Sequence, residues 1–294
     1  PDGVTWTLAN ASGAEQWNGI TFGGNQFIGV GYDSLEGVMS SVTGTGVSQT
    51  LLTLTDSTNL DQFPAGTEIV QDSSGSPETS EITLANTIVG NWLNSVPAGN
   101  TGGNEDILYA DNKWVVVGNA GSNIPTISYS INGQTFTSAN GGSDSSTNFD
   151  YKGVAYGLNK WVAIANNQVA TTAKGQSASS STGTSGWTMN NTTDNEYRWQ
   201  DICFGGDRFV AVANRTIAGS GVSRVMYSTN GTTWTSSATN LQEDFTAVAY
   251  GGSTFVAVTE GGDAYFSSDG STWTRSTTRI SQHDWRDIAY GDGK

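Results

Sequence analysis

Three aspartates stand at the same place in a repeated sequence pattern and are the strongest candidates for chemistry in this chain. Asp106, Asp201 and Asp287 each precede an aliphatic residue that opens a short run ending in a turn. If these runs are equivalent strands around an axis, the carboxylates form a ring that binds a cation or a hydroxylated ligand at a channel mouth. Alternatively, each carboxylate caps the loop that enters its strand. We favour this second interpretation because aspartate commonly bonds neighbouring backbone in this way.

The elements that would position these aspartates are β-hairpins of constant length. An aliphatic residue is followed seven positions later by an aromatic residue in five pairs: Ile20 and Phe27, Ile107 and Trp114, Val154 and Trp161, Ile202 and Phe209, Val248 and Phe255. A turn rich in Gly, Asn or Asp lies inside each pair, which predicts a hairpin. The aliphatic residues at 107, 154, 202 and 248 lie 46 to 48 residues apart. This spacing is typical of a four-stranded repeating unit.

A second motif follows the hairpins and is clearest at residues 265–274, where Ser-Asp-Gly-Ser separates two short alternating runs. Asp and Gly suit a tight turn, and the Trp that follows is suited to plug a core. Weaker copies occupy residues 227–234 and 129–136. The pattern S-x-D-x-G-x-T-W resembles the Asp-box (BNR) repeat of β-propellers. The residues assigned to these motifs are Trp6, Trp92, Phe136, Trp187, Asn230, Trp234, Asp269, Gly270 and Trp273.

The resemblance implies an all-β fold, namely a β-propeller of four-stranded Asp-box blades. Residues 1–294 hold five complete blades, and the two ends supply strands of a split sixth blade. A seven-bladed ring is the alternative if more chain is missing. We therefore expect a single propeller segment of a longer chain.

Two stretches interrupt the repeat. Residues 38–85 are expected to be a β-rich insertion within the first complete blade. Its Leu-Thr-Leu-Thr-Asp-Ser-Thr stretch is similar to small β modules in structural proteins of marine cyanophages. Residues 173–184 have the Gly- and Ser-rich composition of a flexible loop.

Catalysis is not expected. Sialidases are the best-known enzymes with Asp-boxes, and their chemistry is built on an arginine cluster with Tyr, Glu and Asp. All the arginines here fall in the last third of the chain, so they cannot occupy the inner strands of three separate blades. His283 is the sole histidine, which disfavours a Ser-His-Asp triad and most His-based metal sites. We predict a protein that is not an enzyme, with no metal and no cofactor.

Composition narrows the classes of partner. The 27 acidic and 12 basic residues give a net charge of −15, which disfavours nucleic acid and anionic membranes as partners. Cys203 is the only cysteine, so no intramolecular disulfide forms, and its place in a strand predicts a buried thiol.

Three functional hypotheses follow. The first is a virion protein of a marine phage, such as a tail fibre, spike or capsid accessory, that binds other virion proteins or a host receptor or glycan, either alone or as a homo-oligomer within an assembly. The second is a secreted or cell-surface bacterial propeller that binds glycans or proteins. The third is an assembly chaperone, because Asp-box propellers are similar to the photosystem II assembly factor.

Strand parity predicts where a partner docks. In an up-and-down blade, the connections between strands 2 and 3, and between strand 4 and the next strand 1, share one face. We place the insertion and the longer loops on that face, with Asp106, Asp201 and Asp287 near its centre. The opposite face carries only tight turns and Asp-boxes.

Overall fold

The computed structural model describes residues 16–24, 26–32, 38–41, 92–95, 103–118, 127–141, 150–166, 177–192, 197–216, 223–277, 284–291 and 293. These residues form five sheets built from antiparallel hairpins, and no helix occurs among them. The expected all-β class is therefore confirmed. We call each sheet a blade and number the blades in chain order.

In each blade, the four main strands lie side by side in chain order, with the first strand at one edge of the sheet. Blade 1 comprises β1 (Gln16–Gly23), β2 (Gln26–Tyr32), β3 (Val38–Ser41) and β4 (Trp92–Ser95). Blade 2 comprises β5 (Asn104–Ala110), β6 (Lys113–Gly118), β7 (Ile127–Ser130) and β8 (Thr137–Ser138). Blade 3 comprises β10 (Tyr151–Gly157), β11 (Lys160–Ala165), β12 (Ser177–Ser180) and β13 (Ser185–Asn190), and β9 (Asn140–Gly141) adds a parallel fifth strand at its edge. Blade 4 comprises β14 (Tyr197–Gly205), β15 (Arg208–Thr216), β16 (Val225–Ser228) and β17 (Thr235–Ser236). Blade 5 comprises β18 (Phe245–Gly251), β19 (Thr254–Thr259), β20 (Ala264–Ser267) and β21 (Thr274–Arg275).

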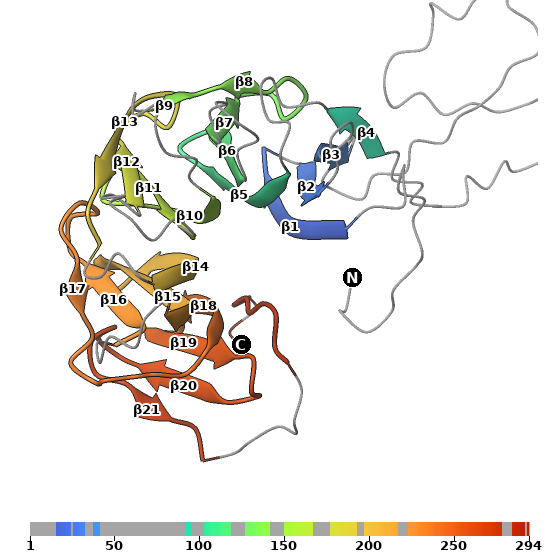
Figure 1. Cartoon of the computed structure of the whole chain (residues 1–294). Helices are drawn as coiled ribbons and strands as arrows, with labels where there is room; N and C mark the ends of the chain where they lie inside the picture. The colour runs from blue at the N-terminus through green and yellow to red at the C-terminus, as the bar shows by residue number, and fades with distance from the viewer. Residues whose placement is uncertain are drawn as a thin grey trace, which may run out of the picture.

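The five blades lie side by side along an open arc (Figure 1). Their first strands line the inside of the arc, where β1, β5, β10, β14 and β18 contact one another in sequence, and the fourth strands lie at the periphery. Residues 284–291 return to the inside of the arc beyond β18. A chain of equivalent strands thus surrounds a common axis.

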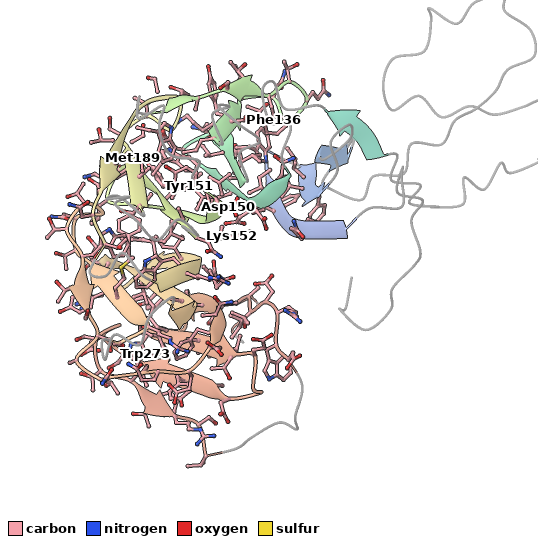
Figure 2. All side chains as sticks on the ribbon, viewed as in Figure 1. Phe136, Asp150, Tyr151, Lys152, Met189 and Trp273 are labelled. Atoms are coloured by element: carbon pink, nitrogen blue, oxygen red, sulfur yellow. The ribbon has the colours of Figure 1, made fainter. Side chains whose placement is uncertain are left out.

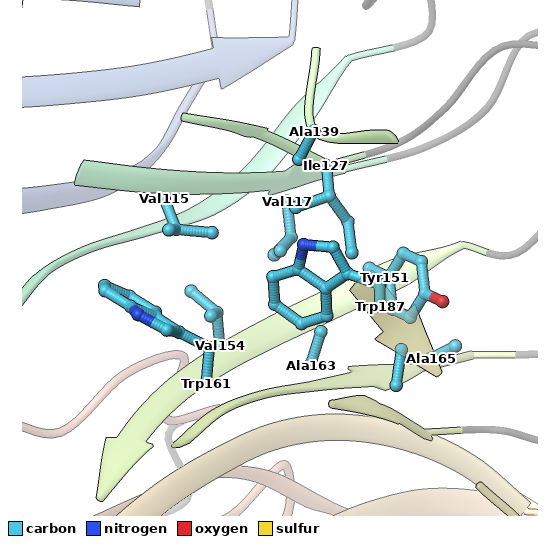
Figure 3. Packing of buried hydrophobic residues seen from close by; sticks show 11 residues of the cluster. Val115, Val117, Ile127, Ala139, Tyr151, Val154, Trp161, Ala163, Ala165 and Trp187 are labelled. Carbon is cyan, nitrogen blue, oxygen red and sulfur yellow. The ribbon is translucent and has the colours of Figure 1, made fainter. Parts of the chain in front are cut away.

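The core lies between neighbouring blades, face against face. Figure 3 shows Val115, Val117 and Ile127 of blade 2 packed against Trp161 and Trp187 of blade 3. Second strands are covered on both sides, so β6 and β11 are apolar and buried at every position after the first. This double burial explains the continuous apolar runs Trp-Val-Val-Val and Trp-Val-Ala-Ile in the sequence.

The predicted hairpins between first and second strands are present. The two central turn residues both have positive φ, as in Asp111 (47°) and Asn112 (55°), or Leu158 (52°) and Asn159 (55°). This conformation matches the type I′ turn that suits the twist of paired strands. Asn and Asp tolerate it because their short side chains bond locally.

The turns between third and fourth strands share one hydrogen-bond network. In blade 5, Ser267 Oγ accepts from Gly270 N (2.8 Å), and Asp269 Oδ1 accepts from Ser271 N (2.8 Å) and Thr272 N (2.7 Å). Blades 2 and 4 repeat these bonds with Asn132 and Asn230 in place of the Asp. The side chain thereby satisfies the amides that the turn leaves unpaired.

The expectation of a flexible loop at residues 173–184 is wrong for its second half. Ser177–Ser180 is the buried strand β12, and Ser180 Oγ accepts from Gly183 N (3.0 Å) as in the other turns. Trp187 was assigned to the motif, but Thr182 replaces the Asp and Trp187 follows the Gly by four residues instead of three, so the strand before the turn was not recognised. All four residues of β12 are buried, and Ser177 Oγ accepts from Trp234 Nε1 of blade 4 (3.0 Å).

The predicted insertion also needs a correction. Val38–Ser41 is β3 itself, paired with β2 through Val30 and Val38 and with β4 through Val38 and Ser95. The long connection is therefore residues 42–91, outside the described residues, and it joins strand 3 to strand 4. Strand parity places its ends on the face of the tight turns, opposite to the face that we predicted.

Candidate functional site

The inner strands share a β-bulge just before the predicted aspartate position. The pairing register of the first hairpin shifts in each blade, at the residues 17/19, 104/106, 151/153, 199/201 and 245/247. A bulge bends its strand and re-aims the adjacent side chains. The residue after each bulge is, in blade order, Gly19, Asp106, Gly153, Asp201 and Ala247. Aspartates therefore alternate with very small residues around the axis.

Each of the two aspartates within the blades holds two inner strands together. Asp106 Oδ1 accepts from its neighbour Ile107 N (2.7 Å), and Oδ2 accepts from Val154 N of the next blade (2.9 Å). Asp201 repeats the arrangement with Ile202 N (2.7 Å) and Val248 N (2.7 Å). Both oxygens of each carboxylate thus bind backbone amides. This supports the interpretation that each aspartate caps the backbone of its own strand, and it adds a second bond to an amide of the next blade.

Burial changes the electrostatics of both carboxyls. Loss of solvation raises the pKa of Asp106 from 3.8 to about 6 against the lowering effect of its two backbone hydrogen bonds. Burial, followed by repulsion from Asp106, raises the pKa of Asp201 to about 8. Repulsion from Asp287 contributes to both shifts, so the three predicted carboxylates do converge on one region. The repulsion among them means that ionising all three is unfavourable.

These shifts predict that stability falls as pH rises. A carboxyl whose pKa is raised from 3.8 to about 6 or about 8 on folding binds more protons in the native state between those values. The free energy of unfolding should therefore decrease from about pH 4 to about pH 8, as measured by urea denaturation at a series of pH values.

Two variants test the assignment. Asp201→Asn should flatten this pH dependence because it removes the group with the larger shift. Asp269→Asn is the matched control, since the pKa of Asp269 is lowered and its titration lies below pH 3.8. A stability that stays constant or rises between pH 4 and pH 8 in the wild-type chain would contradict the prediction.

Asp287 belongs to the segment 284–291, which lies at the open end of the arc. Its Oδ1 accepts from Ile288 N (2.7 Å), so the bond to the following residue matches those of Asp106 and Asp201. The carboxylate is exposed, as are most residues around it. The structure thus places all three predicted residues at equivalent positions, with the third lacking a following blade.

Polar residues also lie at the bulges, in a ring that was not predicted from the sequence. The bulge residues are Asn18, Glu105, Lys152, Gln200 and Thr246, one before each aspartate or small residue. Several are held in place: Lys152 pairs with Glu105 across blades 2 and 3, and Asn18 Nδ2 donates to Asn104 O (2.9 Å). Figure 2 labels Lys152 beside Tyr151 where β10 begins. The sequence signal that could have predicted this ring is a polar residue two positions before the aliphatic residue of each inner strand.

The described aromatic residues of the predicted motifs fill the core between blades, and we call them blade plugs. Phe136, Trp187, Trp234 and Trp273 are all buried, and Trp273 Nε1 donates to Gly270 O (3.1 Å) in its own turn. Trp6 lies outside the described residues, and of Trp92 only its place in β4 is described.

No group of three or more His, Cys, Asp or Glu in the described ranges is arranged to hold a metal ion. Burial and then Asp201 raise the pKa of the Cys203 thiol well above its usual range, which disfavours the reactive thiolate. The described ranges hold no helix that is long and apolar enough to cross a membrane.

Comparison with known proteins supports the fold. No family model matches the chain, and no curated protein matches it. YCF48 bound to D1 peptide is similar over 98% of this chain and 76% of that chain, at 15% identity and a TM-score of 0.57. The chain has a β-propeller fold.

Two further structures agree. YCF48 from Cyanidioschyzon merolae aligns over 96% of this chain and 73% of that chain, at 10% identity and a TM-score of 0.50. The computationally designed propeller Ika8 aligns over 94% of this chain at 13% identity, with a TM-score of 0.54, and this chain spans 65% of its length. At these identities the similarity concerns the fold alone.

Proposed function

We propose that this protein is a non-enzymatic propeller scaffold that binds a polypeptide partner on the face where the inner strands begin. The observation that carries the proposal is the arrangement of the bulges. Half-buried aspartates clamp the inner strands, while polar bulge residues occupy repeated positions near the start of these strands. Binding sites commonly consist of loops and oriented polar groups on a rigid framework.

The connections on this face support the same choice. They join strands 2 and 3, and strand 4 to the next blade, and they vary in length from blade to blade. Arg224 and Asp244 form an ion pair (2.6 Å) that ties two of these connections in blades 4 and 5. On the opposite face, the turns between first and second strands are uniform and short. YCF48 bound to D1 peptide is an example of a propeller that holds a peptide.

We place the scaffold in a virus particle, as a tail fibre, spike or capsid accessory that contacts other virion proteins or a host receptor. The acidic composition, rich in Gly, Ser and Thr, and the phage-like stretch within residues 38–85 support this setting. A secreted or cell-surface propeller that binds glycans or proteins is the alternative. An assembly factor is the third candidate, favoured by the similarity to YCF48.

Two lysines, one on each face of the propeller, provide a matched test because each forms one ion pair. Lys152 pairs with Glu105 at the bulges, and Lys113 pairs with Asp111 at a tight turn. Cosedimentation of the chain with purified phage particles should be lost or weakened several-fold in Lys152→Ala and unchanged in Lys113→Ala. Melting curves of both variants control for folding.

The alternatives give different results in the same experiment. Failure of the wild-type chain to sediment with particles, together with binding to a glycan array, would assign it to the cell surface. Binding to the D1 peptide instead would favour an assembly factor. Loss of binding in Lys113→Ala alone would show that the partner docks on the opposite face.

A further inference from the structure

Three side chains of blades 3 and 4 form one row at the face where the inner strands begin. One pair beyond Tyr151 and Ala165, Asp150 lies opposite Asn166, and Asn166 N donates to Asp150 O (2.7 Å). Asn166 also forms an antiparallel bridge with Arg198, at the start of blade 4. Side chains directly opposite each other in antiparallel pairs lie on the same side, with Cβ atoms about 4.5–5.5 Å apart. Asp150, Asn166 and Arg198 therefore project side by side.

Each side chain in this row has a buried polar atom without a hydrogen-bond partner. The atoms are Asp150 Oδ1, Asn166 Oδ1 and Arg198 Nε, which are two acceptors and one donor. Asn166 as a whole is only 7% exposed. Most buried polar groups in proteins are paired, because an unpaired one loses its bonds to water without replacement. The row therefore offers three unused hydrogen-bonding positions to a ligand.

The corresponding place in blade 5 is filled by the protein itself. Glu260 N donates to Asp244 O (2.9 Å), as the corresponding pair does in blade 3. There Arg224 Nη1 donates to Asp244 Oδ1 (2.6 Å). In the described part of blades 3 and 4, no side chain supplies such a donor to Asp150 Oδ1. Blade 3 thus leaves available a bond that blade 5 makes internally.

The backbone behind the row is held by further bonds. Arg198 pairs with Asn214 on its other side. Gln200 Nε2 donates both to Asn214 Oδ1 (3.0 Å) and to Arg198 O (3.2 Å). The amide oxygen of Asn214 is therefore already bonded, and Arg198 is anchored at its carbonyl group. The three unpaired atoms lie on a fixed framework, which reduces the entropy lost on binding.

Charge and hydrogen-bonding capacity together select the class of ligand. Asp150 and Arg198 carry opposite charges, and the nearby Lys152 and Glu105 pair with each other. A neutral ligand is favoured, because a cation would lie near Arg198 and an anion near Asp150. The ligand must also donate twice and accept once. A primary carboxamide does so with its NH₂ group and carbonyl oxygen, whereas a backbone amide or a hydroxyl has only one donor hydrogen.

We propose that the side-chain carboxamide of an Asn or Gln in the polypeptide partner binds at Asp150, Asn166 and Arg198. Its NH₂ group donates to Asp150 Oδ1 and Asn166 Oδ1, and its carbonyl oxygen accepts from Arg198 Nε. Water has the same donors and acceptor, so it is the competing occupant, and a ligand that reproduces its bonds displaces it without loss. The inference rests on the proposed function, since it names a group that the partner presents to the same face.

Titration with a blocked glutamine, N-acetylglutamine methylamide, tests the site without any partner. In nitrogen–proton correlation NMR of the wild-type chain, the Arg198 Nε–H signal should shift and saturate. Blocked methionine has a similar length without the amide, and blocked glutamate lacks the NH₂ group, so both should bind at least about tenfold more weakly. No saturable shift with blocked glutamine would overturn the proposal and leave water as the occupant. An equal shift with blocked methionine would also overturn it.

Two leucine substitutions at corresponding positions test the assignment. Asn166→Leu removes one acceptor at similar volume and should weaken binding of blocked glutamine at least about tenfold. Glu260→Leu, the same change at the corresponding position of blade 5, should leave that affinity unchanged. If the melting curve shows that Asn166→Leu does not fold, Asp150→Ala takes its place with the same expected loss. Full affinity in a folded variant at either position would overturn the assignment.

The source of the carboxamide and the proposed function are tested separately. Tighter binding of free L-glutamine than of blocked glutamine would assign the site to an amino acid and overturn a polypeptide source. Cosedimentation with phage particles that is lost in both Lys152→Ala and Asn166→Leu would support the inference. Cosedimentation lost in Lys152→Ala but kept in a folded Asn166→Leu chain would overturn the inference and leave the proposed function standing.

Discussion

Replacement of Trp234 by alanine should lower the free energy of unfolding by about 3–5 kcal/mol, the usual range for truncating a large core aromatic. Trp234 is buried in a cluster with Val162 and Ile164 of blade 3 and Phe209 of its own blade. Its Nε1 also donates to Ser177 Oγ of blade 3 (3.0 Å). The truncation would therefore leave a cavity between two blades and remove a hydrogen bond that joins them.

Urea denaturation of the purified chain measures this loss. Ile131→Ala is the matched control, because Ile131 is 73% exposed in the corresponding turn of blade 2 and should change the stability by no more than about 0.5 kcal/mol. A loss below about 1 kcal/mol for Trp234→Ala would mean that the side chain is not a blade plug in solution.

Replacement of Gly205 by alanine should destabilise the protein by about 1–3 kcal/mol, the typical cost of overpacking a core. The new Cβ would lie 2.0 Å from the Tyr250 ring. That ring has little room to move, because it also packs against Phe255 with ring centroids 4.6 Å apart. Either the ring or the inner strand of blade 5 must shift.

The Tyr250→Ala background separates the steric effect from backbone effects. Without the ring, alanine at position 205 has space, and it should raise stability by about 0.4–1 kcal/mol by restricting the unfolded chain. A double-mutant cycle by chemical denaturation gives the coupling between the two positions. Equal effects of Gly205→Ala in both backgrounds would show that the glycine is not required by the ring.

Local features of this protein were determined by the sequence alone. The turn at Asp111 and Asn112 uses residue types that tolerate positive φ. In the Ser267 and Asp269 network, the side chains bond amides within three residues. Such motifs leave a short pattern of residue types. The pattern was sufficient for the all-β class, the propeller blades and the burial of Trp234 and Trp273.

Variation in the same local motif limited the prediction. Thr182 stands where other blades have Asp or Asn, and Trp187 is displaced by one residue, so β12 was taken for a loop. Val38–Ser41 is too short to be distinguished from the residues that follow it until its pairing with β2 and β4 is known. The misplaced insertion followed from that ambiguity.

The role of the aspartates was decided only by the tertiary structure. Nothing near Asp106 or Asp201 in the chain indicates that the second carboxylate oxygen reaches an amide 48 or 47 residues away. The raised pKa values of these groups likewise depend on burial between blades and on repulsion across the axis. Bonds between backbone and side chains of different blades form only when the blades are packed side by side, because no short segment brings those atoms together.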